Sequence, residues 1–212
     1  MPWGISHKYK FIYIHIPKTA GTTICSSWEG ALLKQICKET GVLGGGHKSA
    51  LQIKESYPEE FEKYLKWTVV RNPYDRFVSK YFYKQLKPRE NFDLEWTDQE
   101  SEGLLPQLYW ITDREQFQKA DGYDQFYFHP DTHYGRIIVD RVLRFENLET
   151  ELKALFDELG IPASTKVFPH FRETKKPGMY QPFFDDHLRG LVKFLYREDL
   201  RRLNYEWEEN GK

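Results

Sequence analysis

Two short apolar runs, each closed by a nearby proline and followed by a helical pattern, constrain the fold of this chain more than any other feature. Residues 11–16 and 66–71 consist mainly of β-branched and aromatic side chains, which is typical of short buried strands. A third run of this kind, residues 141–145, also precedes a helical pattern. Because strands that alternate with helices form parallel sheets, the sequence predicts an α/β protein with a central parallel sheet flanked by helices.

Helical patterns occupy much of the remaining chain. Helices are predicted over residues 22–39, from Pro73 onward, from a cap at Asn147 to Gly160 and over about 185–203, with shorter helices over about 104–118 and from a capping box at Ser49. Residues 42–48, which contain three consecutive glycines, and residues 163–184 are predicted as loops. The 212 residues contain no internal repeat and no interdomain linker, so we expect a single domain over 1–212 with three layers.

The charge balance limits the kinds of partner that this chain can bind. Lys and Arg total 31 and Asp and Glu total 32, which gives a net charge of −1. This balance excludes the broad basic field of many nucleic-acid-binding proteins, so any anion must be held by a few locally placed donors. No apolar run approaches the roughly 18 residues of a membrane-spanning helix, and residues 1–8 lack the apolar core of a signal peptide. We therefore expect a soluble, cytoplasmic protein without a membrane segment.

The two cysteines fit a reducing compartment. Cys25 and Cys37 lie in the same predicted helix, 12 residues apart. At the rise of a helix they would be roughly 18 Å apart, which is too far for a disulfide. Both are therefore predicted to be reduced core residues.

The loop after the first predicted strand has the composition of an anion site. A tight loop that leads into a helix collects free backbone N–H groups. Lys18 adds a positive charge, and Gly21 is expected to let the backbone approach the anion closely. The predicted anion-binding residues are Lys18, Thr19, Ala20, Gly21, Thr22 and Thr23. The nucleoside-triphosphatase P-loop differs, because it has glycines before its lysine, whereas Lys18 precedes Gly21.

Two segments resemble the donor-binding motifs of sulfotransferases. Residues 15–23 look like the 5′-phosphosulfate loop of that family, and more narrowly of the family-2 carbohydrate sulfotransferases, which include the heparan 2-O- and chondroitin 4-O-sulfotransferases. Residues 69–81 are similar to the family's 3′-phosphate motif, whose arginine and serine fall on Arg71 and Ser79. Arg76 has no role in that pattern, and we expect it on the helix surface or in an internal ion pair.

The resemblance runs from about residue 10 to residue 206 and carries several expectations. It implies a P-loop-like three-layer fold. It also implies an enzyme that uses 3′-phosphoadenosine 5′-phosphosulfate (PAPS), releases 3′-phosphoadenosine 5′-phosphate and requires no metal. The family has a polar loop over the donor, which places Thr174, Lys175 and Lys176 as further donor-binding residues. Arg172 stands where the family has an asparagine, so a solvated basic loop remains the alternative there.

Lys18 and His47 are the predicted catalytic residues. Lys18 would stabilise the leaving group. Relatives of the heparan 2-O group carry a catalytic histidine in a Gly-His element between the two motifs, which falls on His47. His47 also lies just before the capping box at Ser49, and a helix N-terminus disfavours a nearby cation, which would keep the imidazole neutral. A purely local packing role for His47 is the alternative, and Glu29 or Asp75 could replace it as the base.

The remaining histidines and aromatic residues have weaker assignments. His15 is predicted to be a packed histidine, and His129 and His133 with Asp131 between them are assigned to a loop, because no third ligand is placed for a metal. Aromatic residues make up 17% of the chain and could stack on a sugar. The candidates are Tyr81, Phe82, Tyr83, Tyr109, Trp110, Tyr123, Phe126, Tyr127 and Phe128.

The near-zero charge argues against a highly sulfated glycan as the acceptor. We therefore expect an unsulfated or lightly charged carbohydrate, or a small hydroxylated compound. Two other functions stay open from the residues alone. One is a P-loop-like nucleotide kinase, and the other is a catalytically silent module that binds a nucleotide or a glycan.

Overall fold

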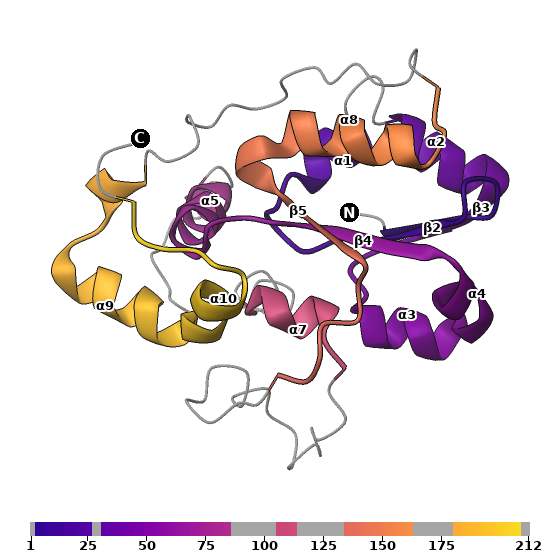
Figure 1. Ribbon diagram of the computed structural model, residues 1–212. Helices are drawn as coiled ribbons and strands as arrows, with labels where there is room; N and C mark the ends of the chain where they lie inside the picture. The colour runs from indigo at the N-terminus through magenta and orange to yellow at the C-terminus, as the bar shows by residue number, and fades with distance from the viewer. Residues whose placement is uncertain (1–2, 27–30, 86–104, 114–133, 163–179, 209–212) are drawn as a thin grey trace.

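The fold is built on a five-stranded mixed sheet (Figure 1). The computed structural model describes residues 3–26, 31–85, 105–113, 134–162 and 180–208. The strands are β1 (Trp3–Ser6), β2 (Phe11–Ile14), β3 (Gly41–Gly44), β4 (Leu65–Val70) and β5 (Arg141–Arg144), in the spatial order β3-β1-β2-β4-β5. The three strands predicted from the sequence, β2, β4 and β5, pair in parallel.

The sheet is parallel among the predicted strands and antiparallel at one edge. Strand β1 pairs antiparallel with both β2 and β3, and neither β1 nor β3 was expected. The pairing of Trp3 with Gly44 explains why β3 could not be recognised. A Cβ atom at position 44 would collide with the Trp3 indole, so a glycine that reads as a loop residue is what allows this strand to pair.

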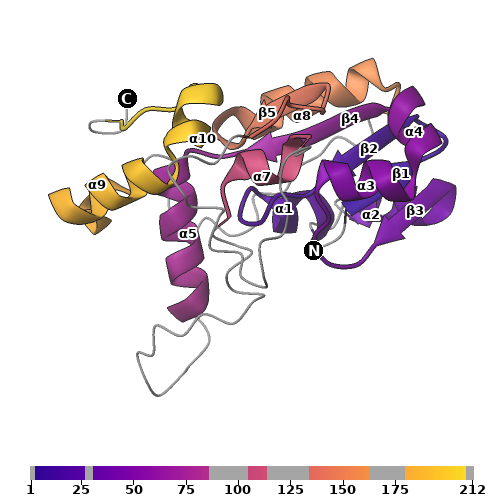
Figure 2. The same cartoon turned by 90° about the horizontal axis from the view of Figure 1, so that it is seen from below.

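Helices cover both faces of the sheet and give the predicted three layers (Figures 1 and 2). One face packs on α1 (Gly21–Ser26), α2 (Ala31–Thr40) and α8 (Leu148–Glu158), and the other on α3 (Ala50–Ser56), α4 (Pro58–Lys63) and α7 (Gln107–Ile111). Along β2 the side chains alternate between two separate cores. Phe11 and Tyr13 enter the first, and Ile12 and Ile14 enter the second.

A third helical group lies beyond the carboxyl end of β4. It consists of α5 (Pro73–Gln85), α9 (Asp186–Leu195) and α10 (Arg197–Arg202), and Figure 2 shows α5 running past α9. Its core contains Tyr74, Val78, Tyr180, Val192 and Tyr196. Residues from the C-terminal part of the chain are thereby brought to the same end of the sheet as the two predicted donor-binding motifs.

Several helix boundaries differ from the predicted ones. The helix expected over 22–39 consists of α1 and α2, with residues 27–30 between them outside the described part. The last helix divides into α9 and α10 at Tyr196, where φ is −110°. Asn147 makes no side-chain capping bond, because the chain enters α8 through a 3-10 turn, η2 (Phe145–Asn147). A second such turn, η4 (Gln181–Phe183), precedes α9.

Three predicted features are confirmed. The capping box at Ser49 is present, with Gln52 N donating to Ser49 Oγ at 3.3 Å and Ser49 N donating to Gln52 Oε1 at 2.8 Å. Gly160, at a φ of +67°, follows the end of α8. Within the described residues 105–113, the helix expected over 104–118 is α7. The predicted loop at 163–184 lies mostly outside the described residues.

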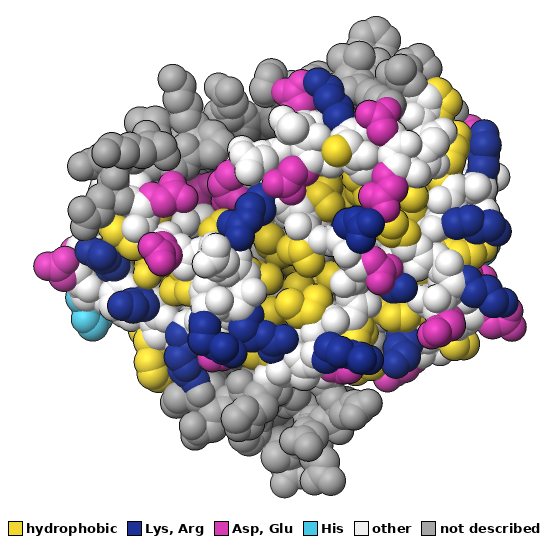
Figure 3. All heavy atoms as spheres, viewed as in Figure 1, with side chains coloured by type: hydrophobic (Ala, Val, Ile, Leu, Met, Phe, Trp, Pro, Cys, Tyr) yellow, Lys and Arg dark blue, Asp and Glu magenta, His cyan; other side chains and the backbone are white. Residues whose placement is uncertain are grey.

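Charges of both signs are interspersed on the face seen in Figure 3, where the densest group of Lys and Arg lies over α10. That helix also carries the partly exposed Glu198, so even there the charge is mixed. In the part of the chain that the structure describes, no helix combines the length and the apolar character needed to cross a bilayer. Cys37 is buried, whereas the side chain of Cys25 lies outside the described part.

Candidate functional site

The loop between β2 and α1 is shaped by hydrogen bonds to its carbonyl oxygens. Thr19 Oγ1 donates to the carbonyl of Ile16 at 2.9 Å. Arg76 Nε donates to the carbonyl of Pro17 at 2.9 Å, and Arg71 Nη1 donates to that of Lys18 at 3.4 Å. Three consecutive carbonyls are therefore held by groups of the protein itself. Because the C=O and N–H of one trans peptide unit point in opposite directions, the bonds to the Pro17 and Lys18 carbonyls also fix the direction of the amides that follow, those of Lys18 and Thr19.

Two residues of this loop have left-handed backbone conformations. Lys18 has a φ of 69° and Ala20 a φ of 71°, although neither is a glycine. Such a conformation costs an L-residue roughly 1–2 kcal/mol. Backbone strain of this kind is concentrated at ligand-binding loops, where the surrounding contacts hold it in place. Alternating left- and right-handed residues also gather N–H groups into an anion-binding concavity.

Gly21 makes a close contact that the sequence did not indicate. It begins α1 and does not have a positive φ. A Cβ atom at this position would collide with the imidazole of His15, whose Nε2 lies nearest. The glycine therefore makes room for a buried histidine. His15 is 2% exposed and stacks on Tyr13 with ring centroids 6.0 Å apart, which confirms the prediction that it is packed.

Arg71 follows β4 and is held on several sides. Its Nε forms an ion pair with Asp75 at 2.7 Å, and its guanidinium lies over the ring of Phe145 at 4.1 Å. Gln107 fixes its backbone, since Oε1 accepts from Arg71 N and Nε2 donates to Arg71 O, both at 2.8 Å. The carboxylate of Asp75, one of the alternative bases, is thus already paired with Arg71. No described residue accepts a hydrogen bond from Arg71 Nη2.

No local sequence pattern indicates the support of Arg71 by Gln107 and, through Gln107, by Asp199. Asp199 of α10 is fully buried, and its carboxylate accepts from the backbone N–H of Gln107 at 2.6 Å and of Leu108 at 3.0 Å. These amides belong to the first turn of α7, where a carboxylate is favourable. A contact across 92 residues has no local pattern, so no reading of the sequence alone could have found it.

His47 lies next to the loop and makes one hydrogen bond of direct chemical consequence. Its Nδ1 lies 3.3 Å from the carbonyl oxygen of His15, and its ring lies 4.7 Å from the His15 ring and 5.7 Å from that of Trp110. A carbonyl oxygen only accepts, so Nδ1 carries the proton and neutral His47 has its lone pair on Nε2.

The surroundings of His47 keep it neutral. The pKa of His47 is lowered from 6.5 to about 4, mainly by burial and also by the nearby charges of Lys80 and Arg76, while the hydrogen bond to His15 acts in the opposite direction. The predicted neutral state therefore holds in the structure, although burial is its main cause and the helix N-terminus is not.

Arg76 is not on the helix surface, as had been one expectation. It is 2% exposed, and besides Pro17 it donates to the carbonyl of Leu105, from Nη1, at 2.9 Å. It thereby connects the loop to the segment before α7. Burial lowers the pKa of Arg76, which reflects the unfavourable desolvation of its guanidinium, and the charge of Asp199 opposes that shift.

The structure thus brings most of the predicted site residues to one end of the sheet. Lys18, Thr19, Ala20, Gly21, Arg71 and His47 are joined by the contacts above. Thr23 and Ser79 are partly buried on α1 and α5. The side chain of Thr22 and the whole of Glu29, Thr174, Lys175 and Lys176 lie outside the described residues, as do His129, Asp131 and His133. Within the described ranges, no three or more His, Cys, Asp or Glu side chains are grouped as metal ligands are.

A comparison with protein-family models matches residues 3–206 to the sulfotransferase family. The chain belongs to the sulfotransferase family. Its family donor is PAPS, so this sulfotransferase is a PAPS-dependent transferase. No curated protein and no solved structure gave a significant match.

The described residues of this sulfotransferase fit a donor with phosphate groups. Hydrogen bonds hold three consecutive carbonyl groups of the strained loop. Lys18 within the loop and Arg71 beside it supply positive charge. These donors are few and local, as the net charge of −1 requires.

Proposed function

We propose that this sulfotransferase transfers a sulfuryl group from PAPS to a hydroxyl of a carbohydrate or of a small hydroxylated compound, with His47 as the general base. PAPS supplies the sulfuryl group and departs as 3′-phosphoadenosine 5′-phosphate. The hydrogen bond from His47 Nδ1 to the His15 carbonyl carries this proposal, because it leaves Nε2 as the proton acceptor. A pKa of about 4 for His47 keeps that nitrogen unprotonated at neutral pH.

In this scheme, different residues of the protein accept the proton, stabilise the leaving group and bind the two phosphates of the donor. Nε2 of His47 takes the proton of the acceptor hydroxyl as its oxygen attacks. Lys18 offsets the negative charge that develops on the leaving phosphate oxygen. Residues 18–23 bind the 5′-phosphate through loop amides and threonine hydroxyls. Arg71 and Ser79 bind the 3′-phosphate, for which the paired N–H groups of a guanidinium are well suited.

We infer the acceptor class from the exposed aromatic residues and the charge of the protein, and not from the donor loop. Tyr81 lies on α5, two residues beyond Ser79, and is 40% exposed, which suits stacking on a sugar ring. Trp110, another candidate, is 2% exposed, so its role is to pack against His47. The net charge of −1 favours an acceptor with little charge of its own.

The base assignment is tested with His47→Ala. We expect this variant to bind 3′-phosphoadenosine 5′-phosphate like the wild type in calorimetry, while its rate of transfer falls by at least about a hundredfold. His7→Ala is the matched control, because His7 is exposed and contacts Tyr64 at the other end of the sheet. Unchanged transfer by His47→Ala would remove His47 from the mechanism.

The leaving-group role is tested with Lys18→Ala, for which Lys63→Ala is the control because Lys63 forms only an exposed pair with Glu59. Transfer by Lys18→Ala near the wild-type rate would contradict that role.

Thermal shift measurements distinguish a sulfotransferase from a nucleotide kinase. We expect 3′-phosphoadenosine 5′-phosphate to raise the melting temperature and ATP·Mg to leave it unchanged. Radiolabelled sulfate transfer across unsulfated glycans, highly sulfated glycans and small hydroxylated compounds identifies the acceptor class, and transfer only to highly sulfated glycans would contradict our assignment.

A further inference from the structure

Arg76 is a buried cation for which the mechanism above has no use. At 2% exposure its guanidinium has left water, which is costly for a charged group unless its donors are well bonded. Its two described hydrogen bonds go to neutral backbone carbonyls, those of Pro17 and Leu105, both at 2.9 Å. An apolar side chain could fill the same space with less desolvation, so the position of these donors is what distinguishes an arginine here.

The bond to Pro17 acts directly on the conformation of the loop. The peptide unit that joins Pro17 to Lys18 is planar, and its C=O and N–H point in opposite directions. Arg76, which holds the Pro17 carbonyl on one side, therefore fixes the amide of Lys18 toward the other side. Lys18 has a left-handed φ of 69°, a conformation that external contacts must maintain. Arg71 makes the corresponding bond to the next carbonyl, at 3.4 Å.

We propose that Arg76 is a positioning residue for the donor's 5′-phosphate, because it holds the Pro17 carbonyl and so orients the amides of the loop that bind this phosphate. The inference rests on the proposed assignment of residues 18–23 to the 5′-phosphate. At 2% exposure, Arg76 would act through the backbone of the loop and not by touching the nucleotide. Its effect should therefore be confined to the 5′ end of the nucleotide and should spare the 3′-phosphate.

The bond to Leu105 extends the same function to the candidate base. Leu105 lies two residues before α7, and α7 carries Trp110, whose ring packs against His47. One buried side chain thus connects the phosphate loop with the helix beside the base. This arrangement explains why a guanidinium, with several donors in a fixed fork, is better suited to position 76 than a lysine.

The test measures how much the 5′-phosphate strengthens binding. Calorimetry gives the dissociation constants of 3′-phosphoadenosine 5′-phosphate and of adenosine 3′-monophosphate, and their ratio isolates the 5′-phosphate. For Arg76→Met we expect this ratio to fall by about tenfold or more, with adenosine 3′-monophosphate bound within about twofold of wild type. Arg76→Lys keeps one donor group, so its ratio should lie between those of the wild type and Arg76→Met. It is also the variant to use if Arg76→Met does not fold.

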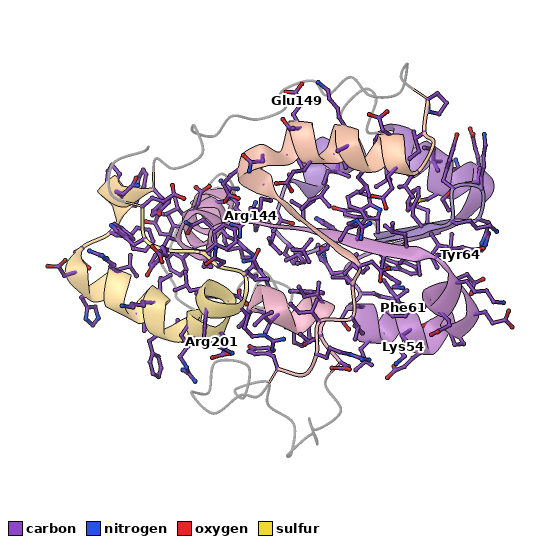
Figure 4. All side chains as sticks on the ribbon, viewed as in Figure 1. Lys54, Phe61, Tyr64, Arg144, Glu149 and Arg201 are labelled. Carbon is purple, nitrogen blue, oxygen red and sulfur yellow. The ribbon has the colours of Figure 1, made fainter. Side chains whose placement is uncertain are left out.

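Arg144→Met is the matched control. Arg144, labelled in Figure 4, also donates from its guanidinium to backbone carbonyls, those of Leu203 at 2.7 Å and Asn204 at 3.3 Å, which belong to the C-terminal segment and not to the loop. The substitution Arg144→Met should leave the ratio of the two dissociation constants unchanged. Equal weakening of both nucleotides by Arg76→Met, or no weakening of either, overturns the positioning role alone. A wild-type protein that binds neither nucleotide overturns the proposed donor site, and the inference with it.

Discussion

At the scale of single residues, the contact between His15 and Gly21 shows how closely the donor loop is packed. The buried imidazole occupies the space that a side chain at position 21 would need. The same imidazole lies against His47, so a change at Gly21 would reach the candidate base through one intervening ring.

Gly21→Ala should therefore destabilise the protein, although alanine is a better helix former than glycine. We expect a loss of about 1–3 kcal/mol in the free energy of unfolding, measured in urea, because the His15 ring must move. Gly190→Ala in α9 is the control, since a Cβ atom there meets nothing within 4 Å. That change should stabilise by up to about 1 kcal/mol. Equal effects of the two substitutions would contradict a steric role for Gly21.

The lowered pKa of His47 predicts how stability depends on pH. The unfolded chain binds a proton at this residue below about pH 6.5, whereas the folded protein binds it only near pH 4. Stability is therefore unaffected by His47 above pH 6.5 and falls as the pH decreases toward 4. Compared with His47→Gln, the wild type should lose about 2 kcal/mol more across that window, a value reduced for the partial exposure of the ring.

Urea unfolding of both proteins at several pH values between 7.5 and 4 measures this difference, and parallel curves would argue against a buried neutral histidine. The acid limb of kcat/KM provides a second measurement. If His47 is the base, that limb should reflect a pKa close to 4 and not the usual 6.5.

At the scale of elements, the start of α3 connects local sequence to the site. The capping box of Ser49 and Gln52 fixes the first turn of α3 only two residues after His47. Because Ser49 is fully buried, no water can replace its hydroxyl as the acceptor for the backbone N–H of Gln52. The cap therefore sets the direction in which the chain carrying His47 leaves the helix.

Ser49→Ala should cost about 1 kcal/mol of stability and should also lower the rate of transfer more than it changes donor affinity. Ser56→Ala is the control on the same helix. Ser56 is exposed and donates to the Gln52 carbonyl at 2.8 Å, so its loss should change neither quantity appreciably. Chemical unfolding and steady-state kinetics measure the two effects, and a rate unaffected by Ser49→Ala would separate the cap from the site.

At the scale of the whole molecule, the C-terminal helices hold the donor site together from outside the two motifs. The chain of hydrogen bonds runs from Asp199 through the first turn of α7 and Gln107 to the backbone of Arg71. Asn72 continues it, since its backbone N–H donates to Glu146 at 2.7 Å and its side chain donates to the Glu206 carbonyl at 3.0 Å. The site thus depends on segments more than 130 residues apart, as Asn72 and Glu206 illustrate.

Asp199→Asn should lower both stability and donor affinity, even though Asp199 lies in neither motif. One carboxylate oxygen becomes an amide donor that faces a backbone N–H, and we expect a loss of about 2–4 kcal/mol. Glu198→Gln is the control on the adjacent residue. Its carboxylate pairs only with Arg201 at the surface, so the loss should stay below about 0.5 kcal/mol. Equal losses would show that the buried network does not carry the effect.

The sequence by itself determined what depends on neighbouring residues. The strands β2, β4 and β5, the capping box at Ser49, the α/β class and the loop composition of residues 15–23 all follow from short-range patterns, because local side-chain periodicity and turn chemistry specify them. The position of Arg71 at the end of a strand was determined in the same way.

Only the tertiary structure decided the features that depend on contacts across the chain. In the tertiary structure, the glycine-rich segment at β3 forms a strand that pairs with β1 at Trp3. The His15 ring occupies the space beside Gly21, and Arg76 is buried with its Nε bonded to the Pro17 carbonyl. The tertiary structure also assigned the proton of His47 to Nδ1 through the His15 carbonyl. Each of these outcomes depends on which distant groups share a small volume, and a pattern of neighbouring residues carries no information about that.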